Sequence, residues 1–350
     1  NDYGVHHSPW RDGKGDVVRD FVEACREYGL AVGLYYSPAD MHSHFFDDEK
    51  AYDEYFLAQL TELLSGYGEI DIIWFDGCGS ENHDYDWPRI TGTIRELQPE
   101  ILIFNMGDPD FRWIGNEAGV APEPHSNLTT QLDVSVRTDR TEALAGQGER
   151  WFLPGECDCM IREDNWFYQE YDSDTVKSPA ELVGLYYNSV ARGSNLLINI
   201  GPDRRGLLPD PDAAALLAFG AEVRRRFSAP VASGDRFEQV GESSWKVVFD
   251  EPRLFDHVVI QEDLTDGEAV TDFSIDIFVA VHGRQVTVHR GQTVGHKRVV
   301  VLPLTKARGI VVHLRDDKTK PRLRDIAVYR TGACDPRTAS ASSNTEGGAV

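Results

Sequence analysis

Short apolar runs alternate with amphipathic stretches through the early part of the chain. The apolar runs occupy residues 30–36, 71–75 and 101–105, and the stretches with helical spacing occupy 12–28, 48–64 and 87–97. Two further helical stretches, 179–189 and 211–226, flank an apolar run at 195–199. Because parallel strands need a long crossover connection, usually a helix, this alternation predicts an α/β fold with helices covering a parallel sheet.

The number of strands bears on whether this sheet can close into a barrel. The chain shows about five strands of this type, whereas a closed (β/α)8 barrel needs eight. It also begins at Asn1 without an initiator Met. We therefore expect a (β/α)8-type, TIM-like barrel over residues 1–228 that is N-terminally truncated, with its first strands upstream of Asn1.

The sequence pattern changes after Pro230. Short segments of alternating apolar residues, separated by turn residues, occupy 245–249, 257–260, 273–277, 299–302 and 309–314. This pattern predicts an antiparallel β-sandwich, which we place at residues 229–331. Residues 332–350 are rich in Ser, Thr, Ala and Gly, a composition that is typical of a disordered tail.

The composition argues against two classes of partner. The chain has 58 acidic and 35 basic residues, a formal net charge of -23. Nucleic acids and anionic membranes attract clustered Lys and Arg instead. Nor does any apolar stretch approach the roughly 20 residues of a membrane-spanning helix. We predict no nucleic-acid binding and no membrane insertion, and the acidic surface is compatible with a neutral substrate such as a sugar.

The cysteines and short motifs give no sign of a metal or cofactor. The five cysteines are an odd number and are scattered, so they predict packed or free thiols rather than a disulfide framework. Cys157 and Cys159 lack the further ligands that a zinc site needs. Neither a P-loop nor an HExxH pattern occurs. We predict that no cofactor and no metal is required.

A carboxylate follows one of the predicted strands directly. The apolar run 72–75 leads into Asp76 and Gly77. In a parallel barrel the carboxyl ends of the strands open onto the active-site face, so Asp76 would point into the pocket. Gly77 would let the chain turn away at once. The alternative is a strand-ending Asp that caps the next helix.

Five short motifs follow one another along the chain: SPW to GKGD at 8–16, GLYYSP at 33–38, WFDG at 74–77, RWIGNE at 112–117 and NLLINIGP at 195–202. Together they resemble glycoside hydrolase family 29, the retaining α-L-fucosidases. In that family, strands carrying a fucose-binding His pair precede the first motif. This resemblance is the second reason for placing the missing strands upstream of Asn1, and it implies that part of the sugar site would be absent from the fragment.

Three segments resemble one subgroup of this family in particular. They are YDW at 85–87, the RWIGNE motif, and GHKR at 295–298. The subgroup is specific for α-1,3/1,4 fucosyl branches on Lewis-type glycans and carries a β-sandwich after its barrel. The resemblance therefore implies both this linkage preference and this domain order.

The resemblance also implies a mechanism with two carboxyl groups. A retaining glycosidase needs a nucleophile and an acid/base about 5 Å apart. Asp76 is the implied nucleophile, and Glu117, in the GNE motif, is the first choice for the acid/base. Glu123 in the same loop and Glu156, which follows an apolar run that could be a strand, remain alternatives.

A fucose pocket needs aromatic side chains beside hydrogen-bonding groups, because the sugar has an apolar methyl face and a polar face. Tyr36 could donate to Asp76, and Arg112 could hold a sugar hydroxyl or orient the acid. Core packing and a surface ion pair are the respective alternatives, and Asn195 and Asn199 are interpreted as structural. The predicted substrate-binding residues are Tyr36, Arg112, Trp113, Trp166 and Phe167.

The function implied is that of an exo-acting α-L-fucosidase that works by double displacement on a fucosylated oligosaccharide or glycoconjugate. One alternative is a non-catalytic sugar-binding protein on a hydrolase barrel. Another is a fucosidase of broader α-1,2/1,6 preference, or a barrel glycosidase for a different sugar. An extracytoplasmic or secreted location is expected from the family alone.

Overall fold

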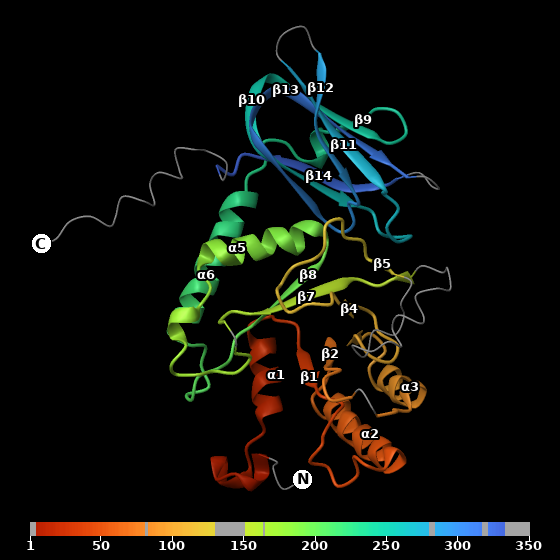
Figure 1. Cartoon of the computed structure of the whole chain (residues 1–350), viewed down its shortest axis with the longest axis vertical. Coiled ribbons are helices and arrows are strands. Elements are labelled where there is room, and N and C mark those ends of the chain that lie inside the picture. Colours follow the sequence, from red (N-terminus) through yellow and green to blue (C-terminus); the bar gives the residue numbers. More distant parts are fainter. Residues whose placement is uncertain are drawn as a thin grey trace, which may run out of the picture. The chain divides into compact units, whose positions relative to one another are not determined.

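A computed structural model describes residues 5–80, 83–129, 151–163, 165–279, 284–316 and 321–332 (Figure 1). The chain separates into two compact units. The N-terminal unit comprises Asn1–Trp113 and Thr129–Pro154, and the C-terminal unit comprises Ile114–Leu128 and Gly155–Val350. The predicted domain limits at residues 228 and 331 stay predictions, and the predicted tail lies almost entirely outside the described residues.

A parallel sheet forms the centre of the N-terminal unit. Strands β1 (Gly33–Tyr36), β2 (Ile72–Phe75) and β3 (Leu102–Phe104) pair in this order. The helices within the described residues of this unit are α1 (Val17–Glu27), α2 (Glu49–Gly66) and α3 (Trp87–Leu97), with short 3-10 helices at Val5–His7 and Trp10–Gly13. The shorter strands β4 (Arg112–Trp113), β5 (Leu128–Thr129) and β6 (Trp151–Phe152) follow in the chain.

An aspartate begins each of the three helices. The side chains of Asp16, Asp48 and Asp86 each accept a hydrogen bond from the backbone N–H three residues later. Such caps satisfy one of the open N–H groups of the first turn. The first helix therefore begins at Val17 and not at residue 12 as predicted, because the chain before it has positive φ angles at Arg11 and Asp12.

The two faces of this sheet differ. Leu34, Ile73 and Ile103 are buried with side chains of all three helices in one core. On the opposite face, the rings of Tyr35, Trp74 and Phe104 form a stacked row, with centroids 5.5 Å and 4.2 Å apart. This aromatic row lies next to the end of β2, where Asp76 follows.

In the C-terminal unit, β7 (Gly155–Met160) and β8 (Asn195–Asn199) pair in parallel. The helices are α5 (Pro179–Asn188) and α6 (Asp210–Phe227), with 3-10 helices at Ser173–Thr175, Val190–Arg192 and Gly234–Arg236. The parallel strands that the structure describes do not form a closed ring within either unit. Closure into a (β/α)8 barrel therefore stays a prediction, while the mixed helix and sheet architecture is confirmed.

The last part of this unit is an antiparallel sheet, which we call the C-terminal sheet. Its strands run in the order β12-β11-β13-β10-β14, and β9 pairs with β10. The strands are β9 (Glu238–Gln239), β10 (Ser244–Glu262), β11 (Asp272–Phe278), β12 (Gln285–Gln292), β13 (Arg298–Arg315) and β14 (Leu323–Tyr329). The β-rich end of the chain is thus confirmed, although five predicted short strands belong to only three strands here.

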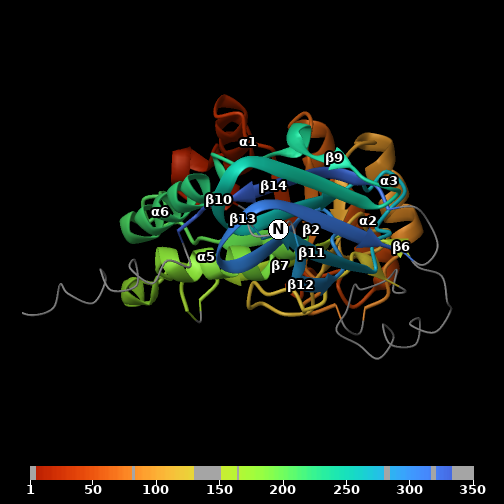
Figure 2. The same ribbon diagram turned by 90° about the horizontal axis from the view of Figure 1, so that it is seen from above.

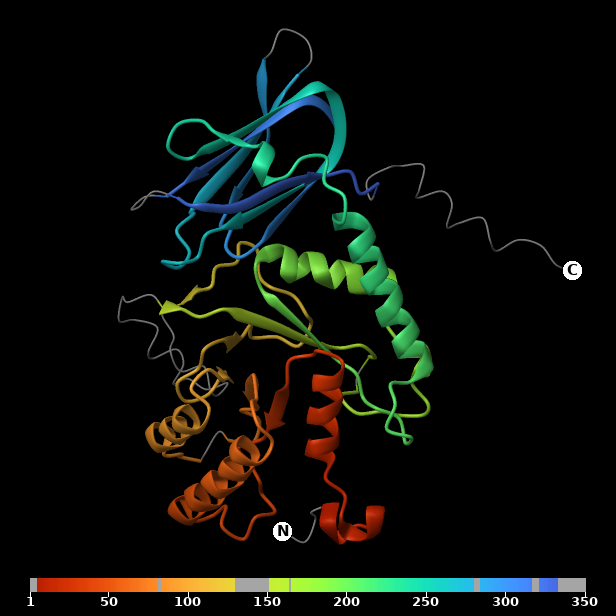
Figure 3. The same cartoon turned by 180° about the vertical axis from the view of Figure 1, so that it is seen from behind.

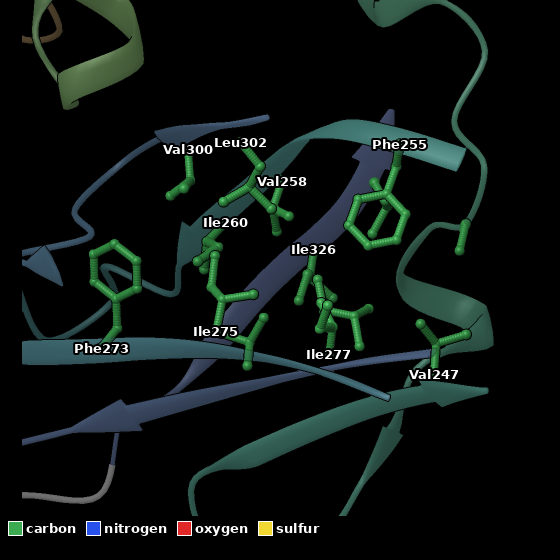
Figure 4. Packing of buried hydrophobic residues seen from close by; sticks show 14 of the residues in the cluster. Val247, Phe255, Val258, Ile260, Phe273, Ile275, Ile277, Val300, Leu302 and Ile326 are labelled. Atoms are coloured by element: carbon green, nitrogen blue, oxygen red, sulfur yellow. The ribbon is translucent and has the colours of Figure 1, made fainter. Parts of the chain in front are cut away.

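Strands β10 and β13 take part in both halves of the C-terminal sheet, one half on each side of their register shifts. Strands β10 and β13 continue through register shifts, between Val248 and Arg253 and between Phe255 and His257, and Figure 2 shows how they curve. Side chains of both halves enter one buried core: Val258, Ile260, Val300 and Leu302 from one half, and Val247, Phe273, Ile275 and Ile277 from the other (Figure 4). The two halves therefore stabilise each other, as the layers of a sandwich do.

The C-terminal sheet packs against α5 and α6 within the same unit (Figure 3). Val259 and Val299 share a small buried cluster with Tyr187 and Phe227. The buried His257 extends this contact, since its Nε2 lies 2.7 Å from the hydroxyl of Tyr187. The sheet is thus joined to the helices beside β7 and β8. Within the described part of the chain, no helix is long and apolar enough to cross a membrane.

Candidate active site

Asp76 directly follows β2, at the carboxyl end of the central strand of its sheet. Its Oδ2 accepts a hydrogen bond from the hydroxyl of Tyr35 at 2.6 Å. Its Oδ1 accepts from the backbone N–H of Cys78 at 2.9 Å. The next helix is capped by Asp86 instead, so the helix-cap alternative for Asp76 is wrong. The partly exposed carboxylate has a fixed orientation and lies beside an aromatic surface.

The hydroxyl partner of Asp76 is Tyr35 and not Tyr36, so the predicted Tyr36 hydrogen bond is wrong. Successive residues of a strand face opposite sides, and Tyr36 lies on the helix side with Phe56 and Phe75. Its hydroxyl donates to Gln59. Burial, and then the hydrogen bond to Asp76, raises the pKa of Tyr35, which keeps this hydroxyl protonated as a donor.

Arg112 and Trp113 form β4 of the N-terminal unit, and both are half-buried. The backbone N–H of Trp113 donates to Oδ1 of the buried Asn105 at 3.1 Å, while Nη1 of Arg112 lies 3.3 Å from the carbonyl oxygen of Trp113. Asn105 has a φ of 67°, a conformation that Asn tolerates better than most residues. The predicted roles of Arg112 and Trp113 in substrate binding stay predictions.

Glu117 lies at an exposed position in a short turn of the C-terminal unit. The turn is attached to β7 on both sides, since the N–H groups of Ile114 and Gly119 donate to its carbonyl oxygens at 2.9 Å and 3.0 Å. The side chain of Asn116 closes the turn, accepting from the N–H of residue 118 at 3.1 Å and donating to the carbonyl of residue 120 at 2.9 Å. Glu117 is therefore presented by a compact and well-bonded backbone.

The two alternative glutamates have different surroundings. Both oxygens of Glu123 accept from the guanidinium of Arg298, at 3.0 Å and 2.6 Å, and Arg192 lies 3.3 Å away. Glu156 is 2% exposed and accepts from the side chain of Asn195 at 2.7 Å. It lies inside β7, whereas the sequence pattern placed it after a strand.

Aromatic residues line a hollow of about 430 Å³ in the C-terminal unit. The predicted pair Trp166 and Phe167 contributes to it, together with Tyr168, Asn199 and residues 200–204. The side-chain amide of Asn199 donates to the carbonyl of Trp166 at 2.7 Å, so its predicted role in holding loop backbone is confirmed. Phe167 is 81% exposed and so is available to a ligand.

A buried arginine holds the same aromatic loop. Arg162 forms ion pairs with Asp172 at 2.5 Å and with Asp212 of α6 at 2.7 Å. It also donates to the carbonyl of Gln169 at 2.9 Å. These contacts join the aromatic loop to α6 and so fix the wall that the loop contributes to the hollow. Nothing in the sequence indicates the role of Arg162, since an isolated arginine carries no local signal of burial.

The cysteines that the structure describes are free, and Cys157 and Cys159 are buried in β7. Burial raises the pKa of both thiols to about 11, so they are protonated at neutral pH. Cys334 lies outside the described residues. In the described ranges, no group of three or more His, Cys, Asp or Glu side chains is arranged to hold a metal ion.

Comparison with known proteins gives a consistent family. The model of the family described as Alpha-L-fucosidase matches residues 4–225. Alpha-L-fucosidase 1 of Arabidopsis thaliana is 30% identical over 365 residues, which cover 94% of this chain and 71% of the plant protein.

Solved structures agree with this family. A glycoside hydrolase 29 family member from an unknown rumen bacterium has a TM-score of 0.82 and 32% identity, over 95% of this chain and 63% of that chain. A Ruminococcus gnavus GH29 fucosidase in complex with fucose has a TM-score of 0.79 over 94% of this chain and 78% of that chain. Its identity is 22%, so it shows a likeness of fold alone.

Proposed function

The chain belongs to the alpha-L-fucosidase family of glycoside hydrolases, and from this we propose that it releases terminal α-L-fucose from fucosylated glycans. One observation carries the proposal. A carboxylate at the end of the central strand, Asp76, accepts two hydrogen bonds and borders the aromatic row of Tyr35 and Trp74. Aromatic faces beside a polar group suit a sugar that has one apolar face.

Asp76 is the proposed nucleophile of a retaining double displacement. Its carboxylate attacks the anomeric carbon while the acid/base protonates the leaving glycosidic oxygen, which gives a fucosyl-enzyme ester. The same acid/base then removes a proton from water, which attacks the anomeric carbon and releases Asp76. The hydroxyl of Tyr35 and the N–H of Cys78 hold the carboxylate of the nucleophile in one orientation.

Glu117 is the proposed acid/base. It is exposed on a turn whose backbone is bonded to β7 on both sides, so it can reach a substrate without losing its position. Glu123 is engaged by Arg298 through both oxygens, and Glu156 is buried within a strand. Of the three glutamates, Glu117 is the one whose exposed position lies in a turn bonded to β7 on both sides, which favours it as the group that a leaving group can approach.

The finer parts of the proposal concern specificity and architecture. Trp166 and Phe167 would supply an aromatic wall, and Arg112 and Trp113 would contribute polar and apolar contacts to the sugar. We extend the proposal to α-1,3/1,4-linked fucose on Lewis-type glycans, to a (β/α)8-type catalytic domain, and to an extracytoplasmic location. The motifs YDW at 85–87 and GHKR at 295–298 support the linkage preference.

The test is fucose release from a Lewis-type trisaccharide and from an α-1,2-linked fucoside in parallel, with the Asp76→Ala variant as control. Release from the branched substrate, with α-fucose as the first product seen by NMR, supports both the linkage and retention. Release mainly from the linear substrate overturns the linkage, and β-fucose as first product overturns double displacement. A folded protein that binds fucose but releases none would favour a sugar-binding function.

A further inference from the structure

We propose that two side chains of the C-terminal sheet, Glu268 and Arg298, are positioning residues that hold the segment 114–128 and thereby fix the place of Glu117. The proposal rests on the proposed function, because it concerns the acid/base of that reaction. We call residues 114–128 the Glu117 segment. It belongs to the same compact unit as the sheet, although more than 100 residues of sequence separate the two.

The first contact joins Glu268, between β10 and β11, to the end of the Glu117 segment. Its Oε2 accepts from the hydroxyl of Ser126 at 2.7 Å and from the N–H of Asn127 at 2.9 Å. Its Oε1 accepts from the side-chain amide of Asn127 at 2.8 Å. A carboxylate with three donors from two consecutive residues forms a strong, charge-assisted anchor.

Asn127 extends this anchor to both parallel strands of the unit. It is 1% exposed, and its Oδ1 accepts from the N–H of Gly155, the first residue of β7, at 2.9 Å. Its Nδ2 also donates to the carbonyl of Gly193, just before β8, at 3.1 Å. Glu268 is therefore bonded to the residue that ties the Glu117 segment to the strands beneath it.

The second contact joins Arg298, the first residue of β13, to Glu123. The two nitrogens of the guanidinium donate to the two carboxylate oxygens, at 3.0 Å and 2.6 Å. Arg298 is 11% exposed in its side chain, so the pair is only partly screened by solvent. Arg192 adds a contact of 3.3 Å to Glu123 and donates to the carbonyl of Ala121.

These two contacts hold the second half of the segment, and the turn that carries Glu117 lies in the first half, which is continuous with it. The turn is attached to β7 through Ile114 and Gly119, and residue 121 then donates to the carbonyl of Asn188 in α5 at 2.8 Å. Between residue 121 and Asn127, the side chains of Arg192, Arg298 and Glu268 contact the chain, and Nε2 of the buried His125 lies 3.0 Å from Oδ1 of Asn127. If the anchors at Glu268 and Arg298 are lost, the second half of the segment can shift and move the turn at Glu117 with it. A displacement of about 1 Å can cost roughly 10²-fold in rate.

The test compares two substrates in the Glu268→Gln and Arg298→Gln variants. Only a poor leaving group needs protonation, so a misplaced acid slows an unactivated fucosyl disaccharide more than an activated aryl fucoside. We expect kcat/KM to fall about 10- to 100-fold for the disaccharide and less than about 3-fold for the aryl fucoside. Equal losses for both substrates would overturn a positioning role.

Matched controls come from the same sheet. Asp256 is buried and accepts from the N–H groups of Thr331 and Gly332, so Asp256→Asn disturbs a comparable carboxylate in another place. Arg322 pairs with Asp263 and Asp266, and Arg322→Gln matches the charge change of Arg298→Gln. Both controls should leave the ratio of the two kcat/KM values unchanged, and a shift as large as in the test variants would overturn the proposal.

A second readout does not depend on activity. Amide hydrogen exchange should accelerate across residues 114–128 in both test variants, with β10 and β13 still protected. Unchanged exchange in the Glu117 segment would overturn the anchor even if activity fell. If the wild-type chain released no fucose, the proposed function would fail, but the exchange experiment would still decide whether the anchor exists. If either Gln variant does not fold, Arg298→Lys is used in its place. Lysine keeps the charge but loses the paired contact, so the expected results are the same.

Discussion

The two proposed catalytic carboxylates are held in different ways. Asp76 follows the central strand of a parallel sheet, and its hydrogen-bond partners are a residue of the neighbouring strand and the backbone two residues on. Glu117 lies in a turn outside regular secondary structure. The segment that carries it is anchored by Glu268 and Arg298, up to 175 residues further along the chain.

This difference shows how sensitive each position is to substitution. A strand end is placed by many backbone hydrogen bonds and by a buried core, so one altered side chain moves it little. A segment held by a few ion pairs and side-chain hydrogen bonds can be released by one substitution. We therefore expect substitutions of surrounding side chains to displace Glu117 more readily than they displace Asp76.

The largest effect is expected from removal of the nucleophile. Asp76→Ala should lower kcat by more than about 10³-fold, since the covalent step loses its attacking group. Thermal stability should change little, because the carboxylate is partly exposed. Asp71→Asn is the matched control at the start of the same strand, where the carboxylate accepts from the N–H of Val32 at 2.6 Å. A large drop in melting temperature for Asp76→Ala alone would identify Asp76 as structural.

The next effect depends on the substrate. Glu117→Gln should slow an unactivated fucoside by about 10²- to 10⁴-fold and an activated aryl fucoside far less, as expected for loss of a general acid. Parallel measurement of kcat/KM for both substrates checks this. Equal losses would transfer the role to Glu123 or Glu156. The comparison of Asp76 with Glu117 would then no longer be one between two catalytic carboxylates.

A smaller effect tests how Asp76 is oriented. Tyr35→Phe removes the 2.6 Å hydrogen bond and should lower kcat about 10- to 150-fold, because a hydrogen bond to a charged group is worth roughly 1.5 to 3 kcal/mol. Tyr36→Phe removes only the contact with Gln59 and should cost about 1 kcal/mol of stability with turnover retained. The reverse result, with Tyr36→Phe inactive, would contradict the assignment of Tyr35.

The smallest effect concerns pH and the C-terminal unit. Burial lowers the pKa of His257, although the hydrogen bond with Asp256 opposes this. The unfolded chain then binds a proton near pH 6.5 that the folded chain does not. The stability that the neutral His257 contributes is therefore present above pH 6.5 and lost as the pH falls below it. His257→Gln should flatten the acid side of the melting-temperature profile, and parallel profiles for the two proteins would refute this.

Several elements of the parallel-sheet regions could be predicted because local patterns decide their limits. The limits of α3 at Trp87–Leu97 and of β8 at Asn195–Asn199 match the sequence interpretation, since an Asp cap and continuous apolar runs mark them. The continuity of β10 and β13 could not be predicted. Each contains a proline, Pro252 or Pro303, which indicates a break, yet both prolines lie where the register shifts and a ladder hydrogen bond is not needed.

Within the candidate site, the position of Asp76 could be predicted and its partner could not. Choosing between Tyr35 and Tyr36 requires the face of the strand, which depends on register with β2. The surroundings of Glu123 could not be predicted either, and the reason is stronger. Nothing near it in the sequence indicates Arg298, because such a pair exists only after the chain has folded.

The separation between Glu123 and Arg298 also has a consequence in time. Ribosomes add about 5 to 20 residues per second, so 175 residues correspond to roughly 10 to 35 s of synthesis. During that interval the nascent chain already contains Asp76, Glu117 and the helices of the N-terminal unit. We expect the nucleophile to reach its final environment first, and the acid/base to gain its last anchor only after Arg298 has left the ribosome.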